Sequence, residues 1–244
     1  MTRNKIFTEP ASTAASRYAR QEGIITQEII QQQHPVVVGC GAVGRQVAII
    51  LATMGFSRIT LVDPDEVEEV NIGSQGFRTD SVGMKKALEC RYFCSEVLGT
   101  TIPTAVPEYF APAQIANLDS PDILCCVDSM SARKQIWDWC KAKAGYYGDI
   151  RMSADVLRSL SATADPEYYE TTLHTDEEGY QDRCTSRTTF YGASCAGSIM
   201  VAEYVKHLRG MPTSADIQFN LLSMKTLDLR RAALVDVTTE LVAT

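Results

Sequence analysis

The chain has 244 residues, of which 45% are hydrophobic and 22% are charged, and its formal net charge is −7. These values are typical of a globular protein with one large domain. The acidic balance argues against a nucleic-acid binder, which usually carries a basic face. No run approaches the roughly 20 apolar residues that cross a bilayer, and the N-terminus shows no apolar secretory core. We therefore expect a cytoplasmic protein with neither a membrane nor a nucleic-acid partner.

The beginning of the chain predicts an arm followed by a helix. Residues 1–16 are polar and rich in alanine, serine and threonine, so we expect a flexible N-terminal arm. Residues 17–244 then form a single predicted domain. Isoleucines spaced along one side predict a helix over residues 16–33.

Two short apolar runs flank a glycine-rich turn. Residues 36–38 are β-branched and too few for a helix, so they predict a buried strand. The glycine-rich turn covers 39–44 and leads into an apolar helical run over 45–54. A second strand is predicted over 59–62 and ends at Asp63. The order strand, turn, helix, strand is that of one parallel βαβ unit.

The glycines in this turn have the spacing of a nucleotide-binding loop. Gly39 allows a tight turn, Gly41 lets a ligand approach the backbone, and Gly44 lets the helix pack closely on the strand. Backbone N–H groups and the helix N-terminus can then face a phosphate. Asp63 stands where an acidic side chain can accept hydrogen bonds from ribose hydroxyls. The sequence therefore predicts that this unit binds a nucleotide.

Strands and helices keep alternating through the middle of the chain. Helices are predicted over 82–98 and 131–144, and strands over 122–127 and 146–152. This alternation favours a mostly parallel sheet that is covered by helices on both faces.

The last third of the chain has a different character. Residues 165–183 are polar, acidic and rich in tyrosine, which indicates a mobile crossover loop, and we place its limits at about 160–193. A small-residue helix over 194–208 and a late strand over 217–227 follow. The predicted fold class is α/β: a Rossmann-like, doubly wound, mostly parallel sheet with a C-terminal antiparallel extension and a mobile crossover loop.

Four separate blocks carry a family resemblance. They are Arg17-Tyr18-Ala19-Arg20-Gln21; the glycine loop; Asp63-Pro64-Asp65-Glu66-Val67 with Asn71, Gln75 and Gly83-Met84-Lys85-Lys86; and Asp128-Ser129-Met130-Ser131-Ala132-Arg133. In this order and spacing, from Arg17 to about Gly210, the sequence resembles the ThiF/MoeB/HesA family, the bacterial relatives of ubiquitin-activating enzymes. That family adenylates the C-terminal carboxylate of a ubiquitin-like protein with MgATP and releases pyrophosphate.

The resemblance implies a role for each matching residue. Lys86 would contact the phosphates, Asp128 would position Mg²⁺, and Asp63 would hold the ribose. Arg20 would act as an arginine finger in the active site of the second subunit of a homodimer. Further nucleotide contacts would come from Asp65, Asn71 and Gln75, the last two holding phosphate or ordering the loop. Such cations and a metal fit the chemistry, since a carboxylate that attacks an α-phosphate brings anions together.

Each of these residues also has a structural alternative. Lys86 could be a solvated lysine at a helix start, with Lys85 beside it as the more solvated of the two. Asp128 could cap the helix that follows it, as aspartate commonly does. Arg17 and Arg20 could be surface charges on an amphipathic helix.

One block departs from the family pattern. The family carries an arginine that contacts the ATP phosphates between its Asn and Gln, but this chain has Ser74 at that position. Arg78 lies four residues on, and we hypothesise that it substitutes. If nothing substitutes, catalysis would be slower or the substrate would differ.

The cysteines indicate chemistry at one position and no metal site. The chain has eight cysteines but no Cys-x-x-Cys pair, so no zinc is expected. Cys184 lies in the predicted crossover loop between Arg183 and Arg187, and nearby arginines favour the reactive thiolate. In the family a cysteine in this region can take over the activated acyl group or carry sulfur. Cys184 is therefore a candidate nucleophile, with an inert loop cysteine as the alternative.

Three functions remain open. The leading one is an ATP-dependent adenylyltransferase that activates the C-terminal Gly-Gly carboxylate of a small ubiquitin-like or sulfur-carrier protein. The second is a catalytically weak or inactive ThiF-like scaffold subunit, which the loss of an arginine at Ser74 favours. The third is an NAD-dependent oxidoreductase, since the glycine loop and Asp63 serve there equally well.

Overall fold

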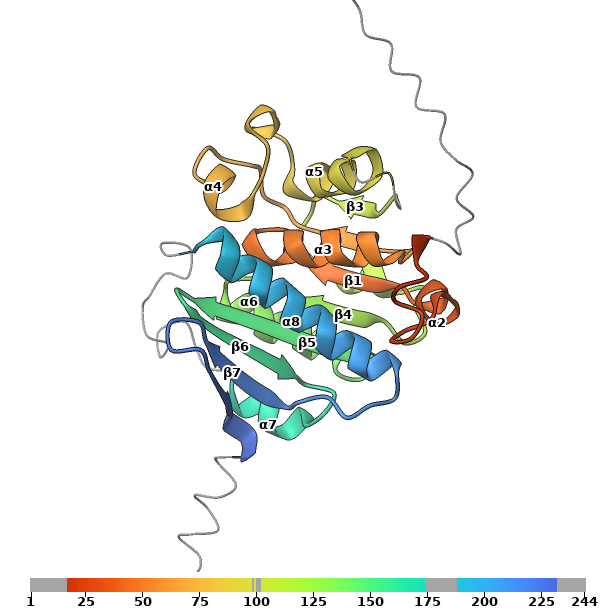
Figure 1. Cartoon of the computed structure of the whole chain (residues 1–244), viewed down its shortest axis with the longest axis vertical. Helices are drawn as coiled ribbons and strands as arrows, with labels where there is room; N and C mark the ends of the chain where they lie inside the picture. Colours follow the sequence, from red (N-terminus) through yellow and green to blue (C-terminus); the bar gives the residue numbers. More distant parts are fainter. Residues whose placement is uncertain (1–16, 98, 100–101, 174–187, 232–244) are drawn as a thin grey trace, which may run out of the picture.

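The computed structural model describes residues 17–97, 99, 102–173 and 188–231. The predicted arm at 1–16 and the candidate nucleophile Cys184 lie outside these residues. In this part of the chain, eight strands form one sheet in the order β3-β2-β1-β4-β5-β6-β7-β8 (Figure 1).

The sheet has a parallel part and an antiparallel part. Its strands are β1 (Pro35–Val38), β2 (Thr60–Val62), β3 (Thr104–Val106), β4 (Asp122–Cys125), β5 (Tyr146–Ser153), β6 (Val156–Ser161), β7 (Asp216–Asn220) and β8 (Lys225–Asp228). Strands β1 to β5 pair in parallel, and β6 to β8 continue the sheet antiparallel. The predicted fold class is therefore confirmed. Val38 pairs with Val62 and Cys125, so the carboxyl ends of β1, β2 and β4 meet at one edge.

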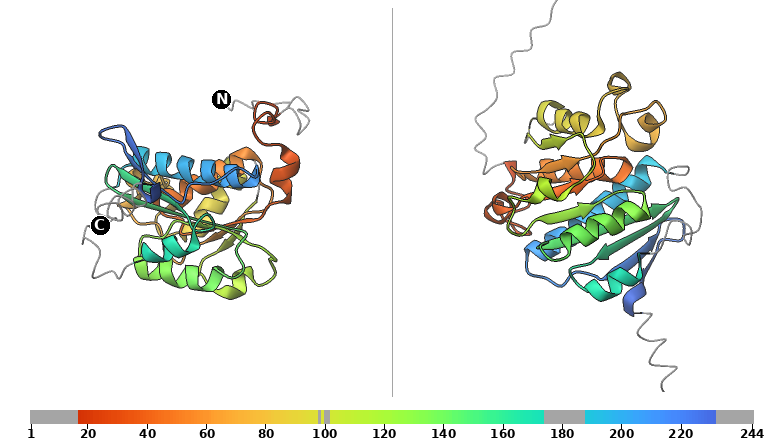
Figure 2. Two further views of the ribbon diagram at one scale, coloured as in Figure 1. Left: turned by 90° about the horizontal axis from the view of Figure 1, so that it is seen from below. Right: turned by 180° about the vertical axis from the view of Figure 1, so that it is seen from behind.

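Helices cover both faces of this sheet. They are α2 (Gln27–Gln32), α3 (Ala42–Met54), α4 (Asn71–Gln75), α5 (Lys86–Tyr92), α6 (Met130–Cys140), α7 (Pro166–Thr171) and α8 (Phe190–Leu208), with short turns η1 (Thr79–Ser81), η2 (Phe93–Val97) and η3 (Pro112–Ile115). Figure 2 shows α3 and α8 on one face and α6 and α7 on the other. Among the helices of the described residues, none is long and apolar enough to cross a membrane.

The two hydrophobic cores follow from the alternation of side chains along each strand. In β1, Val37 joins the core beneath α3 and α8, whereas Val36 and Val38 join the core beneath α6. In β4, Leu124 and Ile123 divide in the same way. Successive residues of a strand point to opposite faces, so a strand that is covered on both faces carries a nearly continuous apolar run.

Two predicted elements near the ends of the described chain are wrong in extent. The helix predicted over 16–33 is reduced to α2, because the Thr26 hydroxyl accepts the N–H of Ile29 at 3.4 Å and caps a new helix there. The late strand over 217–227 is a hairpin of β7 and β8. The chain reverses at Met224, whose φ of +54° lies in the left-handed region.

Two strands and two α-helices carry no clear sequence pattern and went unpredicted: β3, β6, α4 and α7. The strands are short or half polar. Helix α7 falls inside the predicted crossover loop, where the Asp165 carboxylate accepts the N–H of Tyr168 at 3.0 Å and Pro166 opens the helix. Tyr169 of α7 is buried against Trp137, with ring centroids 5.1 Å apart. The first part of the predicted loop is therefore packed on the sheet.

Candidate nucleotide-binding site

The glycine loop lies at the point where the strand order reverses, between β1 and β4. Gly39 has φ of +89°, and a Cβ there would lie 2.9 Å from the Cys126 carbonyl oxygen. A Cβ on Gly44 would lie 1.7 Å from the Gly39 carbonyl oxygen. Only glycine fits these two positions, as the sequence predicts. In an open α/β sheet this reversal point, at the carboxyl ends of the strands, is where ligands bind.

Helix α3 begins in this loop with its amide groups uncapped. Gly41 is the N-cap and supplies no side-chain hydrogen bond. A Cβ on Gly41 would meet the Gln75 side-chain oxygen at 3.6 Å, which is ordinary contact. Unlike Gly39 and Gly44, Gly41 is therefore not required by packing within the chain. A 13-residue helix with free N-terminal amides favours an anion at this end.

Asp63 is buried at the end of β2 and organises the loop. Its carboxylate oxygens accept the N–H of Cys40 at 2.6 Å and the N–H of Asp65 at 2.8 Å. Burial raises the pKa of Asp63, while these two amides and the ammonium group of Lys86 act in the opposite direction. Each oxygen keeps a second lone pair, so the same carboxylate can still accept from a ligand hydroxyl.

Lys86 is the enclosed member of the lysine pair. Its side chain is 10% exposed, and Nζ lies 3.0 Å from Oδ2 of Asp65, which is 61% exposed. The Lys85 side chain is 37% exposed and donates to the Pro64 carbonyl at 2.8 Å. A pair with one solvated partner is weak, so Lys86 can exchange Asp65 for a stronger anion.

Asn71 and Gln75, at the two ends of α4, differ in what they contact. The Asn71 side-chain oxygen accepts the N–H of Glu68 at 3.0 Å, so Asn71 orders the loop before α4. The Gln75 side-chain oxygen is buried, contacts no hydrogen-bond partner among the described residues, and faces Gly41. Which end of an amide faces a site is an assignment, so either end can be offered to a ligand. The Gln75 side chain can therefore form a hydrogen bond with a ligand at the glycine loop.

Asp128 follows β4 and lies beside the glycine loop, because Gly39 packs against Cys126 and Val127. It does not cap α6. Ser129 is the N-cap and accepts the N–H of Ala132 at 3.3 Å, so the capping alternative is wrong. The Asp128 carboxylate is exposed and makes no hydrogen bond or ion pair with another described residue.

Arg20 does not join these residues within one chain. The neighbouring Gln21 side chain donates to the Met54 carbonyl at 2.8 Å, and Tyr18 packs on Gly55, so this segment lies at the C-terminal end of α3. At 1.5 Å per residue, the 13 residues of α3 put the glycine loop about 20 Å away. Figure 1 shows the segment at the end of α3 remote from α4.

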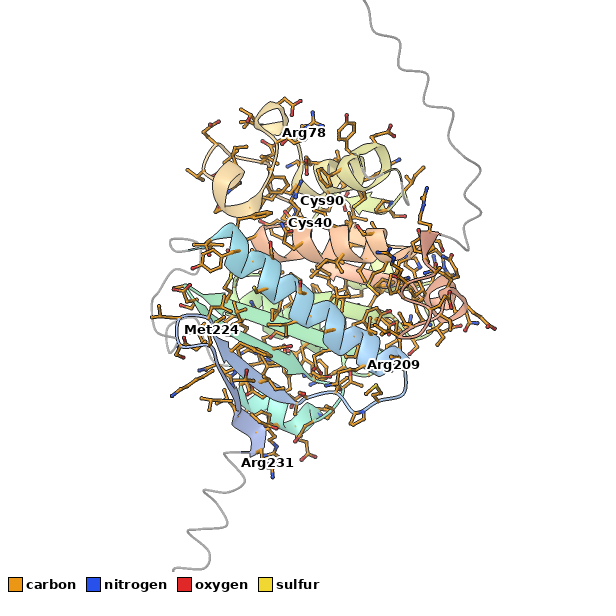
Figure 3. All side chains as sticks on the ribbon, viewed as in Figure 1. Cys40, Arg78, Cys90, Arg209, Met224 and Arg231 are labelled. Atoms are coloured by element: carbon orange, nitrogen blue, oxygen red, sulfur yellow. The ribbon has the colours of Figure 1, made fainter. Side chains whose placement is uncertain are left out.

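Arg78 makes its contacts away from the glycine loop. Its guanidinium pairs with Asp80 and lies 5.2 Å from the centre of the Tyr92 ring, and these contacts raise the pKa of Arg78. Together with Met84 and Tyr92, Arg78 lines a small pocket of about 150 Å³. No residue of the glycine loop lines this pocket. Figure 3 shows Arg78 on the far side of Cys90 from Cys40. The Ser74 hydroxyl donates to the Val70 carbonyl at 3.1 Å.

Two buried ion pairs were not found from the sequence. Arg45, in the first turn of α3, lies 3.4 Å from Glu89 of α5 and 4.5 Å from the centre of the Phe93 ring. Arg133, the last residue of the fourth block that carries the resemblance, pairs with Asp149 of β5. A charged residue in a helical run is normally read as a solvated face, and nothing local marks these two as buried. Among the described residues, no cluster of three His, Cys, Asp or Glu side chains could hold a metal ion on its own.

The sequence also matches known proteins. A model described as the ThiF family matches residues 13–238. "Adenylyltransferase and sulfurtransferase MOCS3" of Aedes aegypti is 32% identical over 135 residues, which are 51% of this chain and 30% of that protein. "Molybdopterin-synthase adenylyltransferase" of Escherichia coli (strain K12) is 28% identical over 119 residues, which are 48% of each chain. This chain thus spans about half or less of the length of these relatives.

Solved structures share the fold over most of the chain. PaaA has a TM-score of 0.68 and 18% identity, covering 93% of this chain and 76% of PaaA. E. coli MccB with ATP has a TM-score of 0.66 and 17% identity, covering 89% of this chain and 72% of MccB. At such identities the likeness shows the fold alone.

Proposed function

The chain belongs to the ThiF family, and from this premise we propose that it is an ATP-dependent adenylyltransferase. Its substrate in this proposal is the C-terminal carboxylate of a small ubiquitin-like or sulfur-carrier protein that ends in Gly-Gly. One observation carries the proposal: Asp63, Lys86 and the unpartnered Asp128 surround a glycine loop at the reversal point of the sheet. Curated relatives that are named adenylyltransferases support it.

The residues fit a nucleoside triphosphate. In the proposal the ribose lies against Asp63, and the phosphates lie on the glycine loop and the uncapped start of α3. Lys86 exchanges the solvated Asp65 for the phosphates. Asn71 holds the loop in place and Gln75 offers its amide to the nucleotide. Of these side chains, Asp63 and Gln75 already lie against the glycine loop.

The residues also fit one Mg²⁺ bound together with the nucleotide. Mg²⁺ is usually held by one or two carboxylates with substrate phosphates and water, and the Asp128 carboxylate has no described partner to give up. A bound Mg²⁺ would offset the charge of the phosphates. Asp128 would hold it, since no protein-only cluster is needed for such a site.

The proposed reaction is a displacement at the α-phosphorus. An oxygen of the carrier's carboxylate forms a bond to that phosphorus, the bond to the bridging oxygen of pyrophosphate breaks, and pyrophosphate leaves with the electron pair. The product is an acyl adenylate. Lys86 stabilises the negative charge that builds up on the phosphates. Outside the described residues, Cys184 could then displace AMP from the adenylate and hold the acyl group as a thioester.

Pyrophosphate exchange tests this function. The purified chain with MgATP and a small protein ending in Gly-Gly should exchange labelled pyrophosphate into ATP, and removal of the terminal glycine should stop the exchange. Cys184→Ser should keep the exchange and lose any covalent carrier adduct. NADH turnover without exchange would favour an oxidoreductase. Absence of ATP binding would favour the scaffold function, to which the serine at position 74 gives weight.

The class of the carrier is proposed from the names of the relatives. Relatives named for sulfur transfer favour a sulfur carrier. A solved complex of MccB with AMPCPP and MccA shows that a protein of this fold can hold a nucleotide analogue and its partner together. A peptide tail is therefore the alternative substrate. Location in the cytoplasm remains a prediction.

We propose that Arg20 acts across a homodimer, because about 20 Å of α3 separates it from the loop of its own chain. Arg20→Ala and Asp128→Asn should each lose pyrophosphate exchange. In a random mixture, half the dimers are mixed and each has one intact site, so exchange should recover to about one quarter of wild type. The measurement is exchange before and after subunits are mixed, with wild type plus Asp128→Asn as the control. No recovery would show that Arg20 serves its own chain or none.

Nucleotide affinity should depend on pH through Asp63. Burial raises its pKa from the ordinary 3.8, so the buried carboxylate takes up a proton at a higher pH than an exposed aspartate does. At low pH the protonation of Asp63 stabilises the nucleotide-free folded protein relative to the unfolded chain. The same protonation removes the ionised carboxylate that accepts hydrogen bonds from the ribose. The Kd for ATP should rise as the pH falls through the raised pKa. Asp63→Asn should bind weakly with a flatter pH profile, and identical slopes for both proteins would contradict this role.

A further inference from the structure

Asp149 of β5 lies at the centre of a buried polar network that the proposed nucleotide contacts do not include. Its side chain is fully buried, and both of its carboxylate oxygens are engaged. Arg133 donates to Oδ1, while Arg151 Nε at 2.8 Å and the Tyr169 hydroxyl at 3.0 Å donate to Oδ2. A carboxylate this buried needs such partners to stay ionised.

Arg133 extends this network to the turn that follows β4. Its guanidinium also donates through Nη2 to the Val127 carbonyl and through Nη1 to the Ile150 carbonyl at 3.2 Å. The Val127 carbonyl and the Asp128 N–H belong to the same planar peptide unit. The arginine that is fixed by Asp149 thus fixes the peptide from which Asp128 projects.

Nothing else described restrains the Asp128 side chain. It is exposed and unpaired among these residues, and Ser129 rather than Asp128 caps the next helix. The backbone around Asp128 therefore sets the direction of its Cα–Cβ bond, and with it the positions that the carboxylate can reach. That backbone is held by Arg133 on one side of Asp128 and by the Ser129 cap on the other.

We propose that Asp149, acting through Arg133, is a positioning residue that sets the Asp128 carboxylate for the magnesium ion of the bound nucleotide. This rests on the proposed function, in which Asp128 holds that ion. Mg²⁺ demands near-ideal octahedral geometry, so a rotated Val127 peptide weakens the metal-dependent part of nucleotide binding. No hydrogen bond joins Asp63 or the glycine loop to Asp149 or Arg133 among the described residues, so nucleotide binding without metal should change less.

The test compares the Kd of a fluorescent ATP analogue with Mg²⁺ in excess and with a chelator, on the full chain. The ratio of the two values is the magnesium gain. Asp149→Asn should reduce the gain about tenfold, since partners behind a metal ligand typically contribute 10–100-fold. Its Kd in chelator should stay near the wild-type value. A merely structural role would lower both affinities through the folded fraction and leave the ratio unchanged.

Asp216 provides a matched control. It is also fully buried, accepts from Arg158 at 3.0 Å and 2.6 Å, and accepts the Tyr168 hydroxyl at 2.8 Å. It lies on β7, two strands beyond β5. Asp216→Asn removes the same kind of charge and should lower the melting temperature, yet it should keep the full magnesium gain.

A second variant covers the case in which Asp149→Asn does not fold. Arg133→Lys keeps a cation beside Asp149 but lacks the planar fork that also reaches Val127, so it should lose the gain as well. The inference is overturned if Asp149→Asn and Arg133→Lys both fold and keep the wild-type magnesium gain. Where Asp149→Asn does not fold, a wild-type gain in Arg133→Lys alone overturns it. It is also overturned if Asp216→Asn loses the gain as much as these variants do. If instead Asp128→Asn keeps the gain, Asp128 is not the metal residue and the inference fails, whereas pyrophosphate exchange still tests the proposed function separately.

Discussion

Lys86→Met should lower the rate of ATP–pyrophosphate exchange about 10²–10³-fold, the usual cost of removing one group that stabilises developing charge. The Lys86 side chain is nearly enclosed and is held beside the loop by the solvated Asp65. Methionine fills much of the same space and removes the charge together with the ammonium N–H donors. ATP binding should weaken less than exchange, because the charge on the phosphates grows as pyrophosphate leaves.

Lys85→Met is the matched control. Lys85 is the preceding residue, has the same side chain, and contacts Glu66 and the Pro64 carbonyl at the surface. Its removal should change exchange by less than about threefold, as expected for an exposed ion pair. Equal losses in the two variants would mean that general electrostatics, and not the position of Lys86, governs the rate.

Gly44→Ala should be the most destabilising single change in the glycine loop. The added Cβ would lie 1.7 Å from the Gly39 carbonyl oxygen and 2.8 Å from its carbon, so the backbone must move. We expect the free energy of unfolding to fall by more than about 4 kcal/mol, or the protein to become insoluble. Thermal and denaturant unfolding would measure it.

Two other glycines separate packing from binding. Gly73→Ala has no atom within 4 Å of its new Cβ and lies inside α4, so it should stabilise the protein by about 0.5–1 kcal/mol. Gly41→Ala makes only ordinary contact with Gln75 and should fold normally, yet bind ATP more weakly because the methyl group faces the ligand. A stable Gly44→Ala protein with wild-type affinity would refute the packing role of Gly44.

Local sequence was sufficient where the structure is local. The glycine loop, the first turn of α3 and Asp63 follow one another within a single βαβ unit, and their hydrogen bonds stay inside it. The buried strand β1 is apolar throughout and β4 is apolar after its first residue, Asp122, which distinguishes both strands from loops. Their pattern therefore predicted both the parallel sheet and the point where a ligand would lie.

The remainder depends on contacts between distant segments. Asp149 gives no local sign that it is buried, because two of its three side-chain partners, Arg133 and Tyr169, come from α6 and α7. Glu89 likewise looks like a solvated helix residue until α5 packs on α3, where burial raises its pKa and Arg45 lowers it. Helix α7 was hidden by its acidic, tyrosine-rich composition. Glu170 accepts from Trp137 of α6 and from Lys141, the C-cap of that helix, both at 3.0 Å, so its polarity serves packing rather than a loop.

The length of α3 has a consequence for how the proposed enzyme would behave on dilution. If each catalytic centre needs the guanidinium of Arg20 from another copy, an isolated chain has a nucleotide-binding site that lacks this arginine. Turnover per molecule should then fall steeply once the protein is diluted below the dissociation constant of the pair, while ATP affinity per chain falls much less. The cellular concentration of the protein would then itself set the activity of each molecule.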